Sequence, residues 1–408
     1  MNKPDKKDFL PIIIGTDLNA YTMSLSFYEE YGIKPILVGK GPVSYTDGST
    51  IIEKIYYTEK INDTEFFINY LNELAEEKKK SYKKLLLIGT NDNYVTFIIK
   101  NKDALSKNFE FSYPDLELAE ELYFKKNFYS LAAKHGLDVP LTYFYSCNNK
   151  ESFNEDVPFP IIVKPNDGIA YYRNPFEGMQ KIYIVENYKE LHEVIQKIKG
   201  SGYREELIIQ EYIPGDDTQM YDSVYYADRD RKAQFVSFGQ VIMQEPTVTG
   251  VGNYTALIVR KNKEVMDKLV RFMEDIGYKG FANFDMKYDS RDGLYKLFEV
   301  NIRQGRSTYY LTQCGYNIAK TIVDDVIYKE DKEFTYVNSD HLFSVVPRGV
   351  LKRYVLDPEI AKEVKKLIKE KKYKNPIFYK SDWGLKRNFR MLLRQINYFR
   401  KYKNNPLK

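Results

Sequence analysis

The chain has 408 residues, 43% of them hydrophobic and 29% charged, which is ordinary for a globular protein with room for two or three domains. No apolar run approaches the roughly 18–20 residues that span a bilayer. The N-terminal residues lack the long apolar region of a signal peptide, so we expect a cytoplasmic protein. Two cysteines, Cys147 and Cys314, are too few for a disulfide framework or a zinc cluster.

The net charge of +5 conceals an asymmetry along the chain. Residues 351–408 contain 18 Lys/Arg against 5 Asp/Glu, a net charge of +13, so the rest of the chain carries about −8. A basic segment on an acidic body predicts an anionic partner for that segment. It argues against a protein that binds nucleic acid along its whole length.

The first segment alternates short apolar strands with helical stretches. The predicted strands are PIIIG, KPILVG and KLLLIG, at residues 11–15, 34–39 and 84–89. This alternation predicts a doubly wound α/β domain, whose ligands bind at the carboxyl ends of the strands. Polar residues follow these ends, namely Asp17, Asn19, Asn91 and Asp92. Their turn-forming propensity alone would also explain them.

Beyond Pro114 the pattern changes to longer helices and paired strands. Helical periodicity predicts helices over residues 125–136, 187–200 and 262–277. Asn187 and Glu190 form a capping box at the start of the second helix. A strand is predicted over residues 159–165, and residues 206–217 are predicted to form a strand that runs into a turn.

Residues 280–305 predict two strands around a turn. If residues 291–293 form a three-residue loop with Gly293 left-handed, Ser290 faces Leu294. That register places Asp285 opposite Glu299 and Asn283 opposite Asn301. A slip of one residue would put the two acids on opposite faces of the sheet.

In the predicted register, oxygen ligands gather on one face of the hairpin. Asp285, Glu299 and Asn301 share that face, and Arg303 lies nearby. Adjacent carboxylates repel unless a proton or a cation separates them. A few hard oxygen ligands suit Mg²⁺, which takes its remaining ligands from water and phosphates. The pattern therefore predicts a phosphate-bearing substrate, and the alternative is an exposed hairpin with charged pairs.

Lysines within strands are the remaining candidates for binding phosphate. The chain has neither a P-loop nor a nucleophile elbow. Its three histidines are scattered and are given no role. Lys164 interrupts an apolar strand, where burial without a partner would be costly and an anion would relieve the cost. Lys125 stands at a helix start, where a surface lysine is an equally good explanation.

These motifs, in this order, resemble the ATP-grasp fold of carboxylate–amine ligases. The resemblance covers roughly residues 115–330 and is strongest to the D-aspartate ligase group, which attaches D-aspartate to the side-chain amine of the peptidoglycan precursor. It is carried by QEYIPGDD (210–217) and by GFANFDMKYDSRDGLYKLFEVNIRQGRS (280–307). The resemblance implies an α/β domain (1–114), a two-lobed α+β ATP-grasp domain (115–330) with a lid at about 150–215, and a basic helical extension (331–408).

The resemblance also implies roles for individual residues. Phosphate and nucleotide binding fall to Lys125, Lys164, Gln210, Asp217 and the backbones of Glu211 and Ile213. Two Mg²⁺ ions fall to Asp285, Glu299 and Asn301. Arg303 would stabilise the acyl phosphate and its tetrahedral successor, and Arg306 and Ser307 would lie near the acceptor carboxylate. Many members have glutamates at positions 210 and 217, and the loop at 166–179 is poorer in glycine than is usual in the family.

The implied reaction consumes ATP and joins an amino acid to an amine through an acyl phosphate, releasing ADP and phosphate. The implied substrates are D-aspartate and the lysine side-chain amine of the anionic UDP-MurNAc-pentapeptide. Another ATP-grasp ligase that forms a dipeptide or a polyamide is an alternative, as is a regulator that binds ATP without turnover. Arg303 counts against the regulator, because binding alone needs no arginine at the transition state. A nucleic-acid-binding module would rest on the basic tail alone.

The basic tail predicts two helices. The first begins at Asp357 and Pro358, and its apolar residues Ile360, Val364, Leu367 and Ile368 share a face. The second has the apolar stripe Phe389, Leu392, Leu393, Ile396 and Phe399, accompanied by Arg387, Arg390, Arg394, Arg400 and Lys401. It is expected to pack on the body with its basic face in solvent, to bind the anionic precursor, or to contact the anionic inner membrane surface.

Overall fold

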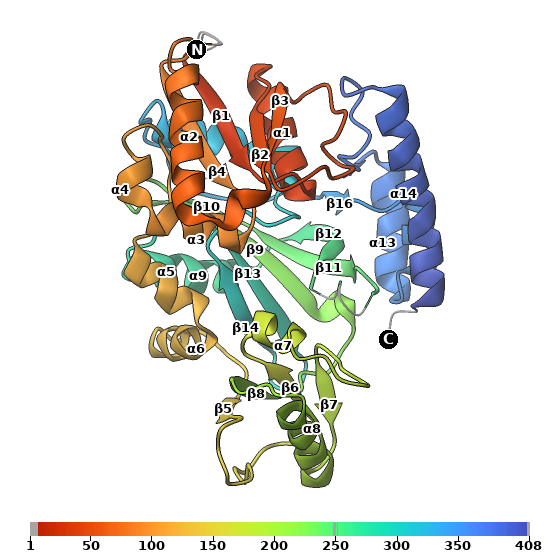
Figure 1. The fold of residues 1–408 in the computed structure, drawn as a ribbon. Helices are drawn as coiled ribbons and strands as arrows, with labels where there is room; N and C mark the ends of the chain where they lie inside the picture. Colours follow the sequence, from red (N-terminus) through yellow and green to blue (C-terminus); the bar gives the residue numbers. More distant parts are fainter. Residues whose placement is uncertain (1–6, 248–249, 251, 406–408) are drawn as a thin grey trace.

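The computed structural model describes residues 7–247, 250 and 252–405, and the strands of this part form three sheets (Figure 1). The first sheet lies at one end of the molecule and the third at the other, with the nine-stranded second sheet between them. No helix in the described ranges is long and apolar enough to cross a membrane.

The first sheet is parallel throughout, with strand order β3-β2-β1-β4. Its strands are β1 (Phe9–Ile14), β2 (Ile36–Gly39), β3 (Lys54–Tyr57) and β4 (Lys84–Gly89). Its helical elements are α1 (Leu18–Tyr31), η1 (Glu59–Asn62), α2 (Thr64–Lys78), α3 (Asp92–Lys100) and α4 (Lys102–Leu105). Alternate residues of β1 enter two different cores, because Leu10 and Ile12 pack with α2 and α3 whereas Ile13 packs with α1. Helices therefore cover both faces, as the strand pattern predicts.

The second sheet has the order β14-β13-β9-β11-β12-β16-β17, and β10 joins β9 to β15 at one side. Its strands are β9 (Met220–Ala227), β10 (Ala233–Val236), β11 (Phe238–Gln244), β12 (Tyr254–Arg260), β13 (Gly280–Asp289), β14 (Leu294–Asn301), β15 (Thr335–Tyr336), β16 (Leu342–Ser344) and β17 (Tyr373–Lys374). Helices around it include α5 (Leu116–Tyr123), α6 (Lys125–Lys134), α9 (Lys263–Asp275), α10 (Tyr309–Gln313) and α11 (Ile318–Val326). Sequence patterns missed β9 to β12, of which β9, β11 and β12 occupy the middle of this sheet.

The third sheet is small and has its own core. Its order is β5-β8-β6-β7, and its strands are β5 (Thr142–Ser146), β6 (Ile161–Pro165), β7 (Tyr183–Val185) and β8 (Glu206–Glu211). Helix α7 (Gly168–Tyr172) follows β6, and α8 (Tyr188–Gly200) packs Leu191, Ile195 and Ile198 into this core. Asn187 caps α8 by accepting from the backbone N–H of Glu190, which confirms the predicted helix start.

The hairpin of β13 and β14 has the predicted pairing at its functional end. Asp285 faces Glu299 and Asn283 faces Asn301. The predicted pair of Ser290 and Leu294 is wrong, because Asp289 faces Leu294 and the loop has one more residue. An irregularity between Asp285 and Met286 shifts the register by one residue and restores the predicted pairing beyond it.

The C-terminal segment contributes both strands and helices. Strands β15, β16 and β17 extend the second sheet, and the helices are α12 (Arg348–Tyr354), α13 (Pro358–Lys369) and α14 (Leu385–Asn404). Asp357 caps α13, and Val364 and Leu367 are buried as predicted. The expectation that α14 packs with its basic face in solvent is wrong. Its buried face begins with Arg387 and Met391, and its apolar stripe is exposed.

Candidate active site

The predicted metal ligands meet where β13 and β14 pair. Asn301 Nδ2 donates to Asp285 Oδ2 at 3.1 Å, and Lys125 Nζ lies 2.5 Å from Glu299 Oε2. The charge of Lys125 lowers the pKa of Glu299 to about 2. Burial, reinforced by the charge of Glu299, raises the pKa of Asp285 well above its ordinary value. Glu299 is therefore the more acidic member of the pair, and Asp285 is the member that holds a proton more readily.

This donor set fits a divalent cation that also binds phosphate. A cation between Asp285 and Glu299 would relieve the repulsion that helps to raise the pKa of Asp285. The Asn301 amide turns its oxygen toward Arg303 Nη2 at 3.1 Å, so it must rotate to offer that oxygen to such a cation. In the described ranges, no group of three or more His, Cys, Asp or Glu side chains is arranged to hold a metal. Two carboxylates and one amide are few ligands, as is typical of Mg²⁺ held partly by phosphates.

Two lysines reach this cluster from different elements. Lys125 begins α6, and Lys164 lies on β6 of the third sheet. Lys164 Nζ donates to Gln210 Oε1 at 3.2 Å. Burial, together with the positive charge of Lys125, lowers the pKa of Lys164 to about 7. An anion placed between the two lysines would raise the pKa of Lys164 again, because it would favour the charged form of this lysine.

Gln210 is fully buried and fixed by three contacts. Its Nε2 donates to the hydroxyl of Tyr129 at 3.0 Å and to Thr142 Oγ1 at 2.8 Å. Its oxygen is therefore turned toward Lys164. Tyr129 in turn donates to the carbonyl of Phe298 on β14, so Gln210 links the third sheet to the hairpin of the second.

Arg303 is held in place by the first domain. Its Nε and Nη2 donate to the two carboxylate oxygens of Asp92 at 2.8 and 3.1 Å, a bidentate pair. Arg306 Nη1 donates to Asn253 Oδ1 at 2.8 Å. Burial raises the pKa of Asp17, and the charges of Arg306 and Arg303 oppose that rise, so this carboxyl faces both arginines.

The four polar residues that follow β1 and β4 divide into two kinds. Asp17 and Asn91 cap α1 and α3, which is the turn-forming role. Asn19 Nδ2 donates to the carbonyls of Thr90 and Gln304 at 2.8 and 3.0 Å, and Asp92 binds Arg303. The strand ends of the first sheet therefore border the segment that follows β14.

Ser307 is hydrogen-bonded to Asp222, an acid that sequence analysis missed. Its Oγ donates to Asp222 Oδ2 at 2.6 Å, and both residues are buried. Burial raises the pKa of Asp222 to about 6. Asp222 lies on β9 directly opposite Asp285, so a third acid adjoins the paired carboxylates. The run MYDSVYYA, rich in aromatic residues, could have indicated this strand.

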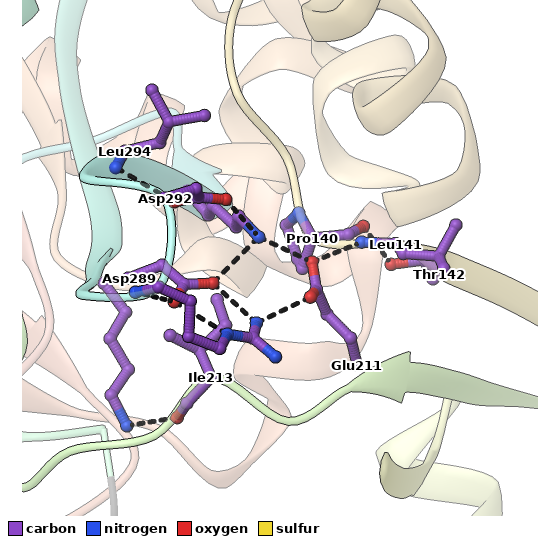
Figure 2. Close-up of polar contacts among 11 residues, drawn as sticks. Pro140, Leu141, Thr142, Glu211, Ile213, Asp289, Asp292 and Leu294 are labelled. Atoms are coloured by element: carbon purple, nitrogen blue, oxygen red, sulfur yellow. Dashed lines mark hydrogen bonds and ion pairs between the residues drawn. The ribbon is translucent and has the colours of Figure 1, made fainter. Parts of the chain in front are cut away.

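The segment after β8 is tied to the hairpin by a buried ionic network (Figure 2). Glu211 accepts from Arg291 Nη2 at 2.7 Å and from Lys296 Nζ at 2.9 Å. Asp289 is fully buried and pairs with the same two cations at 2.5 and 2.9 Å. Glu211 also accepts from the backbone N–H of Leu141, at the entry to the third sheet. Sequence analysis missed every partner in this network.

The backbone beyond Glu211 is held by one further lysine. Lys287 Nζ donates to the carbonyls of Ile213 and Gly215, each at 2.8 Å. Asp217 accepts from Gln244, at 2.5 Å from the side chain and 3.1 Å from the backbone N–H, and burial raises its pKa. Of the predicted site residues, one contact network thus joins Lys125, Lys164, Gln210, Asp285, Glu299, Asn301 and Arg303. Glu211, Ile213 and Asp217 lie on the anchored segment beside it.

Comparisons with known proteins agree with this arrangement. A model of the ATP-grasp domain matches residues 125–307. A D-aspartate ligase from Enterococcus faecium (strain Aus0004) is 33% identical over 413 residues, covering 99% of this chain and 98% of that protein.

Among solved structures, N5-carboxyaminoimidazole synthetase from Staphylococcus aureus matches with a TM-score of 0.58 at 13% identity, over 90% of this chain and 87% of that one. An L-amino acid ligase from Bacillus licheniformis matches with a TM-score of 0.54 at 15% identity, over 79% and 75%. These structures share the fold. The resemblance noted in the sequence is confirmed: the chain belongs to the ATP-grasp family of ATP-dependent ligases and is related over its whole length to D-aspartate ligase.

Proposed function

We propose that the protein uses ATP to join D-aspartate to the lysine side-chain amine of UDP-MurNAc-pentapeptide, a precursor of peptidoglycan. The observation that carries this proposal is the 33% identity to D-aspartate ligase over 99% of the chain. The chemistry is supported by the opposed pair Asp285 and Glu299 beside two lysines and Arg303.

ATP would lie between the third sheet and the hairpin. Lys125 and Lys164 would hold its phosphates, because burial makes the charge of Lys164 costly without an anion and the charge of Lys125 adds to that cost. Gln210 would meet the adenine, together with the backbones of Glu211 and Ile213. Asp217 would bind the ribose hydroxyls.

Asp285, Glu299 and Asn301 would hold two Mg²⁺ ions. When bound, Mg²⁺ neutralises the charge that spreads over a phosphoryl group in transfer. Asp285 would then bind as a carboxylate, and Glu299 would be shared between the cation and Lys125. Lys125 would then be free to turn toward the phosphates, and its present ion pair with Glu299 supports this proposal.

The remaining residues would direct two successive displacements. A carboxylate oxygen of D-aspartate attacks the γ-phosphorus of ATP and the bond to the β-bridging oxygen breaks, giving an acyl phosphate and ADP. The neutral amine then attacks the acyl carbon and phosphate leaves, giving the amide. Arg303, fixed by Asp92, would stabilise the charge on the acyl phosphate and on its tetrahedral successor. Arg306 and Ser307 would lie near the acceptor carboxylate.

The third sheet would act as the lid of the site. The sequence predicts this lid at about residues 150–215, whereas the strands of the third sheet run from Thr142 to Glu211. Closing over the nucleotide would exclude water, which would otherwise hydrolyse the acyl phosphate. Lys164 would move with the lid, so phosphate binding and closure would be coupled.

The test is incubation with ATP, Mg²⁺ and a panel of D- and L-amino acids, with and without UDP-MurNAc-pentapeptide. Mass spectrometry should find one aspartyl residue added to the precursor, only with the D-isomer, together with ADP. Addition of another amino acid, or a dipeptide formed without the precursor, would refute the substrate assignment. ATP binding without any ADP release would refute the ligase mechanism.

A further inference from the structure

Helix α14 turns its apolar face away from the protein. Six apolar side chains on one helical face, Leu385, Phe389, Leu392, Leu393, Ile396 and Phe399, are between 37% and 76% exposed. Their spacing of three and four residues keeps them on one stripe over about 21 Å. Trp383, 62% exposed, stands two residues before the helix. A continuous apolar surface of this length is unusual on a protein that stays in water.

The opposite face of α14 attaches the helix firmly to the body. Arg387 is buried, with Nη2 3.2 Å from Asp382 Oδ2. Arg390 Nη1 lies 2.5 Å from Asp47 Oδ2, and Arg394 Nε donates to the hydroxyl of Tyr45 at 2.8 Å. All three arginines therefore already have partners within the protein, and Arg390 and Arg394 are bound to the N-terminal domain. This argues against the prediction that they bind a soluble anionic precursor.

Other cations of α14 border the apolar stripe. Arg400 and Lys403 are exposed on the same side, and Lys386 is exposed at its margin. The helix has seven Lys/Arg and no Asp/Glu. A helix with this combination lies in the plane of a membrane surface, with its apolar side among the acyl chains and its cations among anionic headgroups.

We propose that the exposed face of α14, with Trp383, is a surface that binds an anionic lipid bilayer. Charge decides between this partner and a second copy of the chain. Two copies packed through the stripe would bring Arg400 and Lys403 of each against a helix without any acid, and the like charges would oppose association. An anionic bilayer instead complements the same cations, and Trp is favoured at the level of the headgroups.

The test uses the full chain and the signal of Trp383, its only tryptophan. Vesicles of equal parts phosphatidylglycerol and phosphatidylcholine should sediment the protein and shift the Trp383 emission to shorter wavelength. Raising NaCl from about 0.05 to 0.5 M should weaken binding several-fold, because the headgroup attraction is screened. Failure to bind these vesicles, or equal binding to pure phosphatidylcholine, would overturn the proposal.

Substitutions on the apolar stripe of α14 test whether this stripe is the surface that binds the vesicles. Substituting Phe389→Ser, Leu393→Ser and Ile396→Ser together should reduce partitioning at least about tenfold, since three exposed apolar side chains are lost. Ile184→Ser on β7, 54% exposed, is the matched control and should bind like the wild type. Circular dichroism and thermal unfolding check that each variant folds. Unchanged vesicle binding by the triple variant would refute the assignment. So would a dimer that the triple substitution abolishes, in a protein that does not bind vesicles.

Discussion

Replacing Lys164 with arginine should remove most of the pH dependence of ATP binding above neutrality. In the free protein, burial and the charge of Lys125 lower the pKa of Lys164 to about 7. Only about one site in eleven would carry the proton at pH 8, and about one in a hundred at pH 9. If the phosphates bind the ammonium form, binding takes up a proton wherever the free lysine is neutral.

The magnitude follows from that protonated fraction. The dissociation constant of ATP should rise about fivefold between pH 7 and 8, and about ninefold between pH 8 and 9. The arginine of Lys164→Arg stays protonated throughout this range. For this variant, the pH dependence of the ATP dissociation constant therefore reports only the titration of ATP and of other groups.

The assay is isothermal titration of ATP from pH 7 to 9, in two buffers with different ionisation enthalpies. The buffers should report uptake of nearly one proton per ATP at pH 8 for the wild type and almost none for the arginine variant. Parallel pH profiles for the two proteins, or no proton uptake by the wild type, would refute the role given to Lys164.

Three further predictions concern the carboxylates, the ionic network and the fixed arginine. Glu299→Gln and Asn301→Ala should each lower kcat about 100- to 1,000-fold with the fold intact, and wild-type turnover by either would contradict the metal assignment. Lys296→Met should lower the free energy of unfolding by roughly 2–4 kcal/mol, measured in urea, because Glu211 and Asp289 then share a single cation. Arg291 and Lys296 hold the pKa of Asp289 below its usual range. The difference in unfolding free energy between wild type and variant should therefore have its full size at neutral pH and become smaller as the pH falls below about 4. An equal loss at low pH would count against the network. Asp92→Asn should reduce kcat more than it changes the KM for ATP, because it releases Arg303 without touching the nucleotide segment. A change confined to the KM for ATP would remove Arg303 from the chemical step.

The hairpin indicates how far local sequence rules extend. The alternation of Phe298, Val300 and Ile302 places Glu299 and Asn301 on one face, and the glycine at position 293 marks the left-handed turn. The loop is nevertheless one residue longer than predicted, and the irregularity beside Asp285 compensates. Turn propensity does not report such a compensation, because it depends on packing against the neighbouring strand.

Contacts between distant segments were not accessible from the sequence. Asp222 was missed because β9 was not recognised, and the partners of Glu211 lie about 80 residues further along the chain. Helix α14 shows a second limit of prediction from sequence. Periodicity establishes that Phe389 and Ile396 share a face, but not whether that face or the opposite one packs on the body. Asp382 and Asp47 decide the orientation, since they hold Arg387 and Arg390 inward.

The most direct test of the central claim follows the oxygen atoms of the reaction. D-aspartate labelled with ¹⁸O in its carboxylates is incubated with the protein, ATP, Mg²⁺ and UDP-MurNAc-pentapeptide, and the phosphate released is analysed by mass spectrometry. Attack of a carboxylate oxygen on the γ-phosphorus predicts one ¹⁸O in each inorganic phosphate, together with ADP and the aspartyl-precursor. Unlabelled phosphate, or AMP in place of ADP, would contradict an acyl phosphate formed at Asp285, Glu299 and Arg303.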